Sequence, residues 1–88
     1  MEKFLKELGI TQVGHYTKND SYVVDIEDSD EYGRVYSLLD KNDDVEENED
    51  NSVLTIHTSS IIFETEEYQL VLIADFDQDT YKLVVNEM

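Results

Sequence analysis

The sequence predicts a single α+β domain over residues 1–88, in which an antiparallel β-sheet with a C-terminal meander packs against two short helices. Short runs rich in Val, Ile and Tyr, separated by turn residues, fill the C-terminal part as consecutive strands would. Two segments upstream carry apolar residues at helical spacing. With 88 residues, 40% of them apolar, the chain is long enough for one modest core and too short for a second.

The N-terminal part predicts a helix followed by a hairpin. An apolar stripe over residues 2–8 indicates the helix, and Gly9 follows where a helix end commonly needs a left-handed residue. Strands at 11–16 and 22–27 flank a polar turn at 18–21. This hairpin would supply the first two strands of the sheet.

The middle of the chain predicts a second helix over residues 30–40. Asp28 stands three residues before Glu31, which is the spacing of a capping box. An apolar stripe at helical spacing should face the sheet, and it consists of Tyr32, Val35, Tyr36 and Leu39. Residues 40–52 contain seven acids and one base, so an acidic loop is expected there.

The C-terminal part predicts the meander. Its four expected strands are 53–58, 61–65, 68–75 and 81–86. The expected turns are Ser59–Ser60, Glu66–Glu67 and Asp77–Thr80. Residues 68–75 are apolar on both faces, which is typical of a central strand.

The charge excludes several classes of function. Six Lys and Arg stand against 22 Asp and Glu, so the net charge is -16 and direct binding to nucleic acid or to an anionic membrane is disfavoured.

The absence of Cys rules out a disulfide and favours a reducing compartment. No signal peptide and no run of about 20 apolar residues is visible, so a cytoplasmic protein is expected.

One acidic segment has a spacing that calcium-binding loops use. Asp75, Asp77 and Asp79 alternate as the first three ligands of an EF-hand loop do, but Thr80 stands at the sixth position and Asn86 at the twelfth. The flanking residues also predict strands instead of helices. A solvated hairpin turn is therefore the favoured interpretation, and no metal or cofactor is expected.

No pattern of a catalytic site is present. His15 and His57 lack the spacing of metal ligands or of a nucleophile and its base, and the three glycines are scattered. The sequence therefore favours a binding protein over an enzyme.

The acids of the middle of the chain are the candidate site. Thirteen of the 22 lie from Asp20 to Asp50, with only Arg34 and Lys41 among them. If the second helix packs its apolar stripe inward, these acids would form an anionic ridge along one edge, able to compete for a basic groove that holds DNA phosphates. The alternative is an acidic surface that only confers solubility. The candidate partner-binding residues are Asp25, Glu27, Asp28, Asp30, Glu31, Asp40, Asp43, Asp44, Glu46, Glu47, Glu49 and Asp50.

The order of helix, strand, acidic turn, helix and antiparallel meander resembles small acidic DNA-mimic proteins of phages and mobile elements. It is most similar to the uracil-DNA glycosylase inhibitors, and anti-CRISPR proteins belong to the same type. In the inhibitors an acidic turn with Glu and Ser lies where the enzyme would hold phosphates, and Glu27-Asp28-Ser29 has a similar place here. Asp30 and Glu31 match the acids of the following helix. The predicted N-terminal hairpin and the acidic loop at 40–52 depart from that pattern.

The resemblance implies an inhibitor that occupies the nucleic-acid groove of a host defence or repair enzyme, either a CRISPR–Cas nuclease or a uracil-DNA glycosylase. If the gene belongs to a phage, the protein would act in the host bacterial cytoplasm. One alternative is an immunity protein that neutralises a toxin nuclease, and another is an accessory phage protein of no specific activity. A homodimer through an exposed strand edge at Ile61–Phe63 also stays open.

Overall fold

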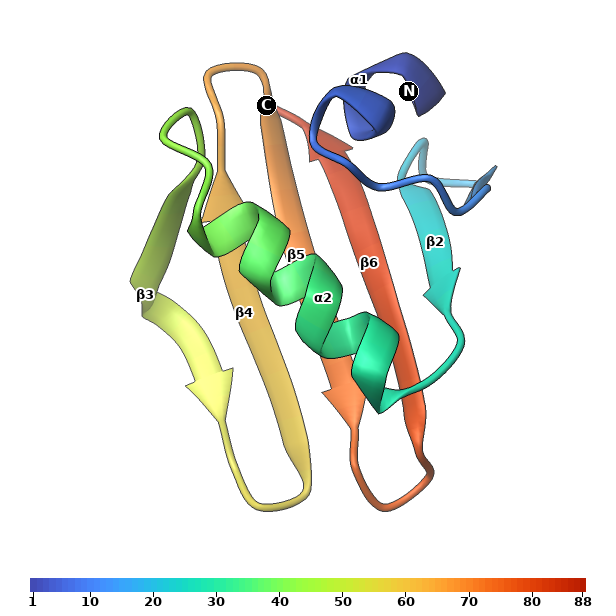
Figure 1. Ribbon diagram of the computed structural model, residues 1–88, viewed down its shortest axis with the longest axis vertical. Helices are drawn as coiled ribbons and strands as arrows, with labels where there is room; N and C mark the ends of the chain where they lie inside the picture. Colours follow the sequence, from blue (N-terminus) through green and yellow to red (C-terminus); the bar gives the residue numbers. More distant parts are fainter.

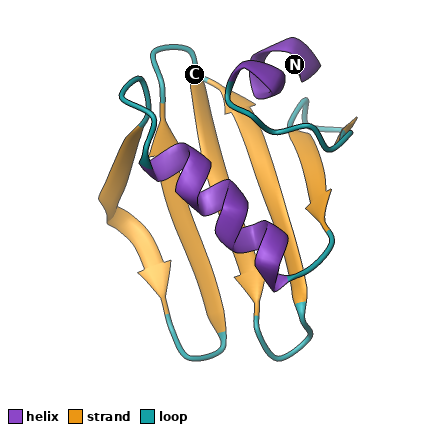
Figure 2. Ribbon diagram, in the orientation of Figure 1, coloured by secondary structure: helices purple, strands orange, loops and turns teal.

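The computed structural model describes residues 1–88 and shows one six-stranded antiparallel sheet with both helices on the same face (Figure 1; Figure 2). The predicted α+β class is therefore confirmed. The molecule measures 31 × 26 × 24 Å. Neither helix is both long and apolar enough to cross a membrane.

The strand order differs from the chain order. The elements are α1 (Glu2–Glu7), β1 (His15–Tyr16), β2 (Tyr22–Ile26), α2 (Ser29–Asp40), β3 (Glu46–Leu54), β4 (Thr58–Glu64), β5 (Tyr68–Asp75) and β6 (Thr80–Glu87). The sheet runs β1-β2-β6-β5-β4-β3, so β3 to β6 form the predicted meander and β2 pairs with β6. Helix α2 connects β2 to β3 by crossing the sheet obliquely (Figure 1).

The end of α1 and the start of α2 are fixed by the glycine and the capping residue that the sequence predicts there. Gly9 has a φ of +92°, and its N–H donates to the carbonyl of Lys6 3.0 Å away, which closes the end of α1. Asp28 caps α2, since its Oδ1 accepts a hydrogen bond from the Glu31 N–H at 2.9 Å. Val35 and Leu39 are fully buried against the sheet.

The core lies between the helices and one face of the sheet. Successive side chains of a strand point to opposite faces, so every second residue of β5 and β6 enters this layer. The buried residues of these two strands are Leu70, Leu72, Ala74, Tyr81, Leu83 and Val85. Phe63 of β4 is also fully buried, and the ring of Tyr36 on α2 packs edge-on against it with the centroids 5.8 Å apart.

The predicted acidic loop is wrong for most of its length. Only the segment between Asp40 and Glu46 connects elements, because β3 begins at Glu46 and pairs with β4. The pairing register shifts between Asn48 and Val53. An edge strand exposes much of its length to water, so it tolerates charges that would destabilise an inner strand.

The predicted turn at Ser59–Ser60 is also wrong. Both residues belong to β4, and the turn lies at 55–57, where the Thr55 hydroxyl accepts the Thr58 N–H at 2.8 Å. Ser59 is buried, and its hydroxyl is paired with that of Tyr32 at 3.2 Å. This hydrogen bond lets a turn-forming residue occupy a core position.

The first predicted strand, 11–16, is reduced to His15–Tyr16. Gly14 passes so close to β2 that an added Cβ would lie 2.4 Å from the carbonyl oxygen of Val23. The Gly14 N–H donates to the Tyr22 hydroxyl at 3.0 Å instead of joining a strand ladder.

Residues 61–63 do not form an exposed strand edge, so they cannot join two copies of the chain by pairing of strand edges. Strand β4 is internal, since β3 and β5 pair with its two sides. The edges of the sheet are β1 and β3.

Candidate functional site

The predicted acids do not form one continuous ridge. They fall into two groups, one where the chain enters α2 from β2 and one where it leaves α2 for β3. Figure 1 shows these two ends of the helix. Twelve residues separate these ends, a length of about 18 Å at 1.5 Å per residue. We call the two groups the N-terminal cluster and the C-terminal cluster.

The N-terminal cluster lines a shallow hollow beside β2 that contains no apolar side chain. Its acids are Asp25, Glu27, Asp28, Asp30 and Glu31. All except Glu31 are exposed. The first turn of α2 adds the positive end of its dipole and the cap at Asp28, so the backbone here is well defined.

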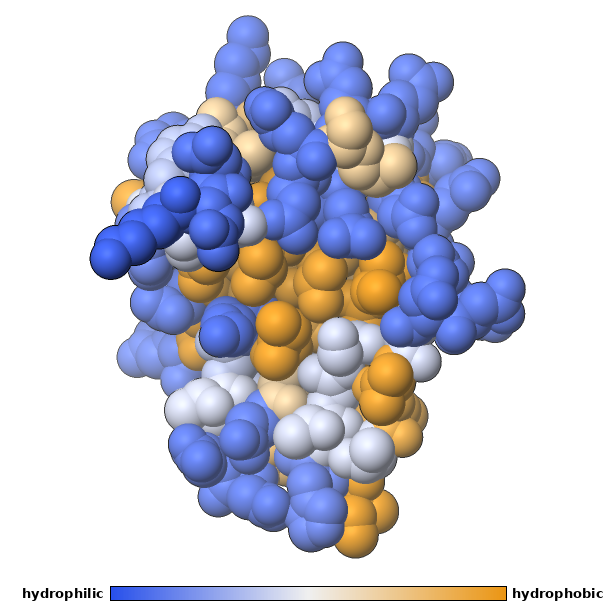
Figure 3. Space-filling model, turned by 180° about the vertical axis from the view of Figure 1, so that it is seen from behind, coloured by the Kyte–Doolittle hydropathy of each residue, from blue (hydrophilic) through white to orange (hydrophobic).

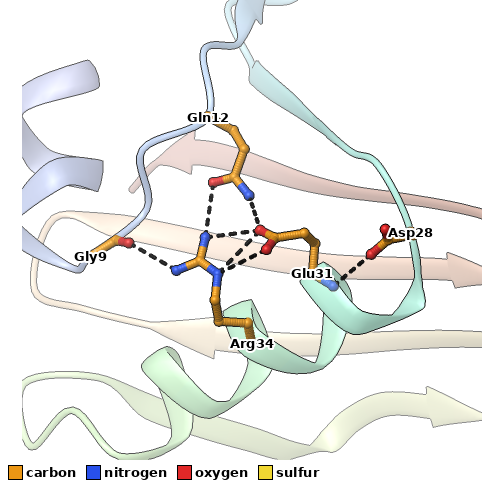
Figure 4. A network of polar contacts seen from close by, with 5 residues as sticks. All are labelled: Gly9, Gln12, Asp28, Glu31 and Arg34. Atoms are coloured by element: carbon orange, nitrogen blue, oxygen red, sulfur yellow. Dashed lines mark hydrogen bonds and ion pairs between the residues drawn. The ribbon is translucent and has the colours of Figure 1, made fainter.

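The Glu31 carboxylate has other partners than the one a capping box would give it (Figure 4). Its Oε2 accepts hydrogen bonds from Arg34 Nη2 at 3.0 Å and from Gln12 Nε2 at 2.6 Å. Arg34 also donates to the Gly9 carbonyl at 3.3 Å. Glu31 and Arg34 therefore hold the segment after α1 against α2, and Glu31 offers less free charge to a partner than its neighbours.

The C-terminal cluster is larger than predicted. The predicted acids in it are Asp43, Asp44, Glu46, Glu47, Glu49 and Asp50. The structure adds four acids that the sequence did not point to, which are Glu7, Glu64, Glu66 and Glu67. They come from α1, the end of β4 and the β4–β5 turn, so only tertiary structure brings them to the predicted group.

Part of the C-terminal cluster lines a second hollow, which we call the C-terminal hollow and which also has apolar side chains in its lining. They are Phe4, Leu8, Val45 and Tyr68. Phe4 and Tyr68 stack with their ring centroids 4.2 Å apart, which fixes α1 against the sheet. The surface therefore combines carboxylates with an apolar floor, a combination that suits the alkyl stem and charged head of Lys or Arg.

Two carboxylates of the cluster directly oppose each other. Glu46 pairs with Glu64 across β3 and β4. Like charges opposite each other in an antiparallel pair are destabilising. Asn48 Nδ2 donates to Glu64 Oε1 at 2.7 Å, which holds one of the two in place.

Asp40 and Glu47 lie near Tyr36 at the C-terminal end of α2. The Tyr36 hydroxyl donates to Glu47 Oε1 at 3.3 Å. Burial, the charges of Glu47 and Asp40 and this hydrogen bond raise the pKa of Tyr36 above its ordinary value. Asp40 is the last residue of the helix, lines neither hollow and faces the negative end of the helix dipole.

The acids of the β5–β6 turn each have a different partner. Asp75 Oδ1 accepts the N–H groups of Asp77 and Gln78, both at 3.1 Å. Asp77 pairs with His57 Nδ1 at 2.8 Å, and Asp79 accepts the Tyr81 hydroxyl at 2.7 Å. Each of the three carboxylates thus has its own hydrogen-bond partner in or beside the turn, in keeping with the interpretation as a hairpin.

Comparison of the chain with protein-family models, curated proteins and solved structures returned no match.

Proposed function

We propose that this protein is a DNA-mimic inhibitor that binds the basic nucleic-acid groove of a host defence or repair enzyme. Its target would be a CRISPR–Cas nuclease or a uracil-DNA glycosylase, in the bacterial cytoplasm where these enzymes work. The two acidic clusters would contact the groove, and binding alone would block the enzyme without any chemistry by the inhibitor.

The observation that carries this proposal is that the fold leaves its acids unneutralised. Of 22 acidic residues, only Glu31 forms an ion pair with Lys or Arg. Repulsion among the remaining carboxylates lowers the stability of the compact state. The opposition of Glu46 and Glu64 adds to this cost. A surface that binds a cationic partner is expected to keep such carboxylates even though they lower the stability of the folded protein.

The spacing of the clusters also suits a DNA-binding groove. The helix length of about 18 Å corresponds to about five phosphates of one DNA strand, counted at 3.4 Å of duplex axis per charge. Secondary structure supports both clusters, through the capped first turn of α2 and through β3 paired with β4. Anionic groups that are already in place lose little conformational entropy on binding.

A displacement assay tests the proposal. Fluorescently labelled duplex DNA is bound to a uracil-DNA glycosylase, to a guide-loaded CRISPR–Cas nuclease and to a toxin nuclease, and the protein is titrated into each complex. Stoichiometric displacement from at least one of the first two enzymes is expected at low salt, with weaker displacement at high salt. Displacement from the toxin nuclease alone would instead indicate an immunity protein.

Matched variants separate the site from the overall charge. Asp28→Asn with Asp30→Asn removes two charges from the N-terminal cluster, and affinity is expected to fall about tenfold or more. Asp20→Asn with Glu87→Gln removes the same charge from positions that line neither hollow. Asp20 has a φ of +63°, which Asn tolerates. Equal effects of the two pairs, or no displacement from any enzyme, would contradict the proposal.

A further inference from the structure

The sheet face opposite the helices carries an apolar patch. Val23 lies opposite Val84, Val84 opposite Val71, and Val71 opposite Ile62. These pairings form a continuous row across β2, β6, β5 and β4. Ile73 extends this row, because it lies two residues after Val71 on β5 and points to the same face. We call these five residues the sheet-face patch, and Figure 3 shows apolar side chains in the middle of this side of the molecule.

An ordinary solvated sheet face would be polar at these positions. Antiparallel sheets with one covered face alternate apolar residues inward and polar residues outward. Strand β5 departs from this rule because Val71 and Ile73 point away from the core that Leu70, Leu72 and Ala74 enter. All five patch residues are partly exposed, and no element of the chain covers them.

Polar and acidic residues surround the patch. On one side a hydrogen-bonded row crosses the strands, in which Ser21 donates to Asn86 and the Asn86 amide donates to Gln69. Four acids on this face are Asp25, Glu46, Glu64 and Asp75, and the one base from these strands is Lys82. An apolar centre with a polar rim is the usual anatomy of a protein interface.

The charge of the rim decides the kind of partner. A second copy would bring another net charge of -16 and another acidic rim against this face, so self-association is opposed. A partner with a basic rim would be attracted instead. We propose that the sheet-face patch docks a protein segment with an apolar stripe flanked by Lys or Arg, as in a basic amphipathic helix.

This second interface goes beyond the proposed inhibition. It lies on the opposite side of the sheet from α2 (Figure 1; Figure 3). Asp25, Glu46 and Glu64 belong both to the rim of this patch and to the acidic clusters. The protein could therefore hold a basic segment on this face while the other acids of the clusters contact a different surface.

A defined peptide pair tests the docking surface. The probe is a short peptide of Leu and Lys whose Leu residues fall on one helix face, and the control is a scrambled peptide of the same composition. NMR chemical-shift mapping on the wild-type protein is expected to show the largest changes at Val23, Val71 and Val84. Equal affinity for the scrambled peptide, or shifts confined to the acidic clusters, would show that only charge is recognised and would overturn the proposal.

A charge-neutral variant tests the apolar centre. Val71→Thr with Val84→Thr keeps β-branched side chains but is expected to weaken probe binding about tenfold. Val13→Thr, at an exposed position outside the patch, should leave binding unchanged. Displacement of DNA from the target enzyme should be the same in all three proteins, which separates this test from that of the inhibitor function.

Unchanged probe affinity in the double variant, or sedimentation of the free wild-type protein as a dimer that hides the patch, would refute the proposal. The mapping on wild-type protein decides the question if the double variant does not fold.

Discussion

Asp28 combines a structural and an electrostatic role that substitutions can separate. Its Oδ1 caps α2 through the Glu31 N–H at 2.9 Å, and its exposed carboxylate belongs to the N-terminal cluster. Asp28→Asn keeps the acceptor, so urea denaturation should show stability within about 0.5 kcal/mol of wild type while target affinity falls. Asp28→Ala loses the cap as well and should be destabilised by about 1 kcal/mol. An Asn variant that binds the target as tightly as wild type would remove this carboxylate from the interface.

Tyr36 makes the stability of the protein sensitive to alkaline pH. Burial, together with the charges of Glu47 and Asp40, raises its pKa in the folded protein. The folded state thus retains the phenolic proton to higher pH than the unfolded chain. The associated stability is fully present below the unfolded pKa of about 10 and is lost as the pH rises through the folded value.

The melting temperature of wild type should therefore fall more steeply above about pH 10 than that of Tyr36→Phe. Circular dichroism melting curves across the alkaline range measure this difference. Parallel curves for the two proteins would show that Tyr36 has the same proton affinity in both states.

At the scale of elements, the acids of β3 are expected to lower the stability of the fold and to strengthen binding to the target. Glu46→Lys replaces a like-charge pair with an opposite-charge pair facing Glu64, which should stabilise the protein by about 0.2 to 1 kcal/mol. The same change reverses a charge in the C-terminal cluster and should weaken target binding. Thermal melting and DNA displacement measure the two effects. A less stable variant with unchanged binding would contradict both parts of the prediction.

The elements that sequence could predict are those with a local signal. Helix α2 has its cap at Asp28 and an apolar stripe, and β5 contains a continuous apolar run over residues 70–74. Strand β3 has no such signal, because its sequence from Glu46 is almost entirely polar and only pairing with β4 makes it a strand. The misplaced turn at Ser59–Ser60 has the same cause, since the hydrogen bond that accommodates Ser59 comes from a helix far away in the chain.

At the scale of the whole molecule, salt should act on folding and binding in opposite directions. Screening reduces the self-repulsion of a chain with a net charge of -16, so the melting temperature should rise with moderate salt. The same screening weakens attraction to a basic groove. Melting curves and displacement assays over one salt series test both signs. A melting temperature that falls with salt would show that the carboxylates do not destabilise the fold.

The candidate site was predictable in composition but not in shape. Clustering along the chain identified the acids of both clusters that come from 25–31 and 43–50. It could not show that α2 separates them, nor that Glu7, Glu66 and Glu67 join the second group. Those facts depend on which distant segments the sheet brings together.

The position of β6 also affects how the protein is made. Of the six strands this one is synthesised last, yet it lies between β2 and β5 and joins residues as distant as Tyr22 and Val85. Until it emerges from the ribosome, β2 has no inner neighbour and one side of β5 remains an unpaired edge that can aggregate. A nascent chain interrupted before Thr80 should therefore remain unfolded, and the six-stranded sheet can close only after translation of this strand is complete.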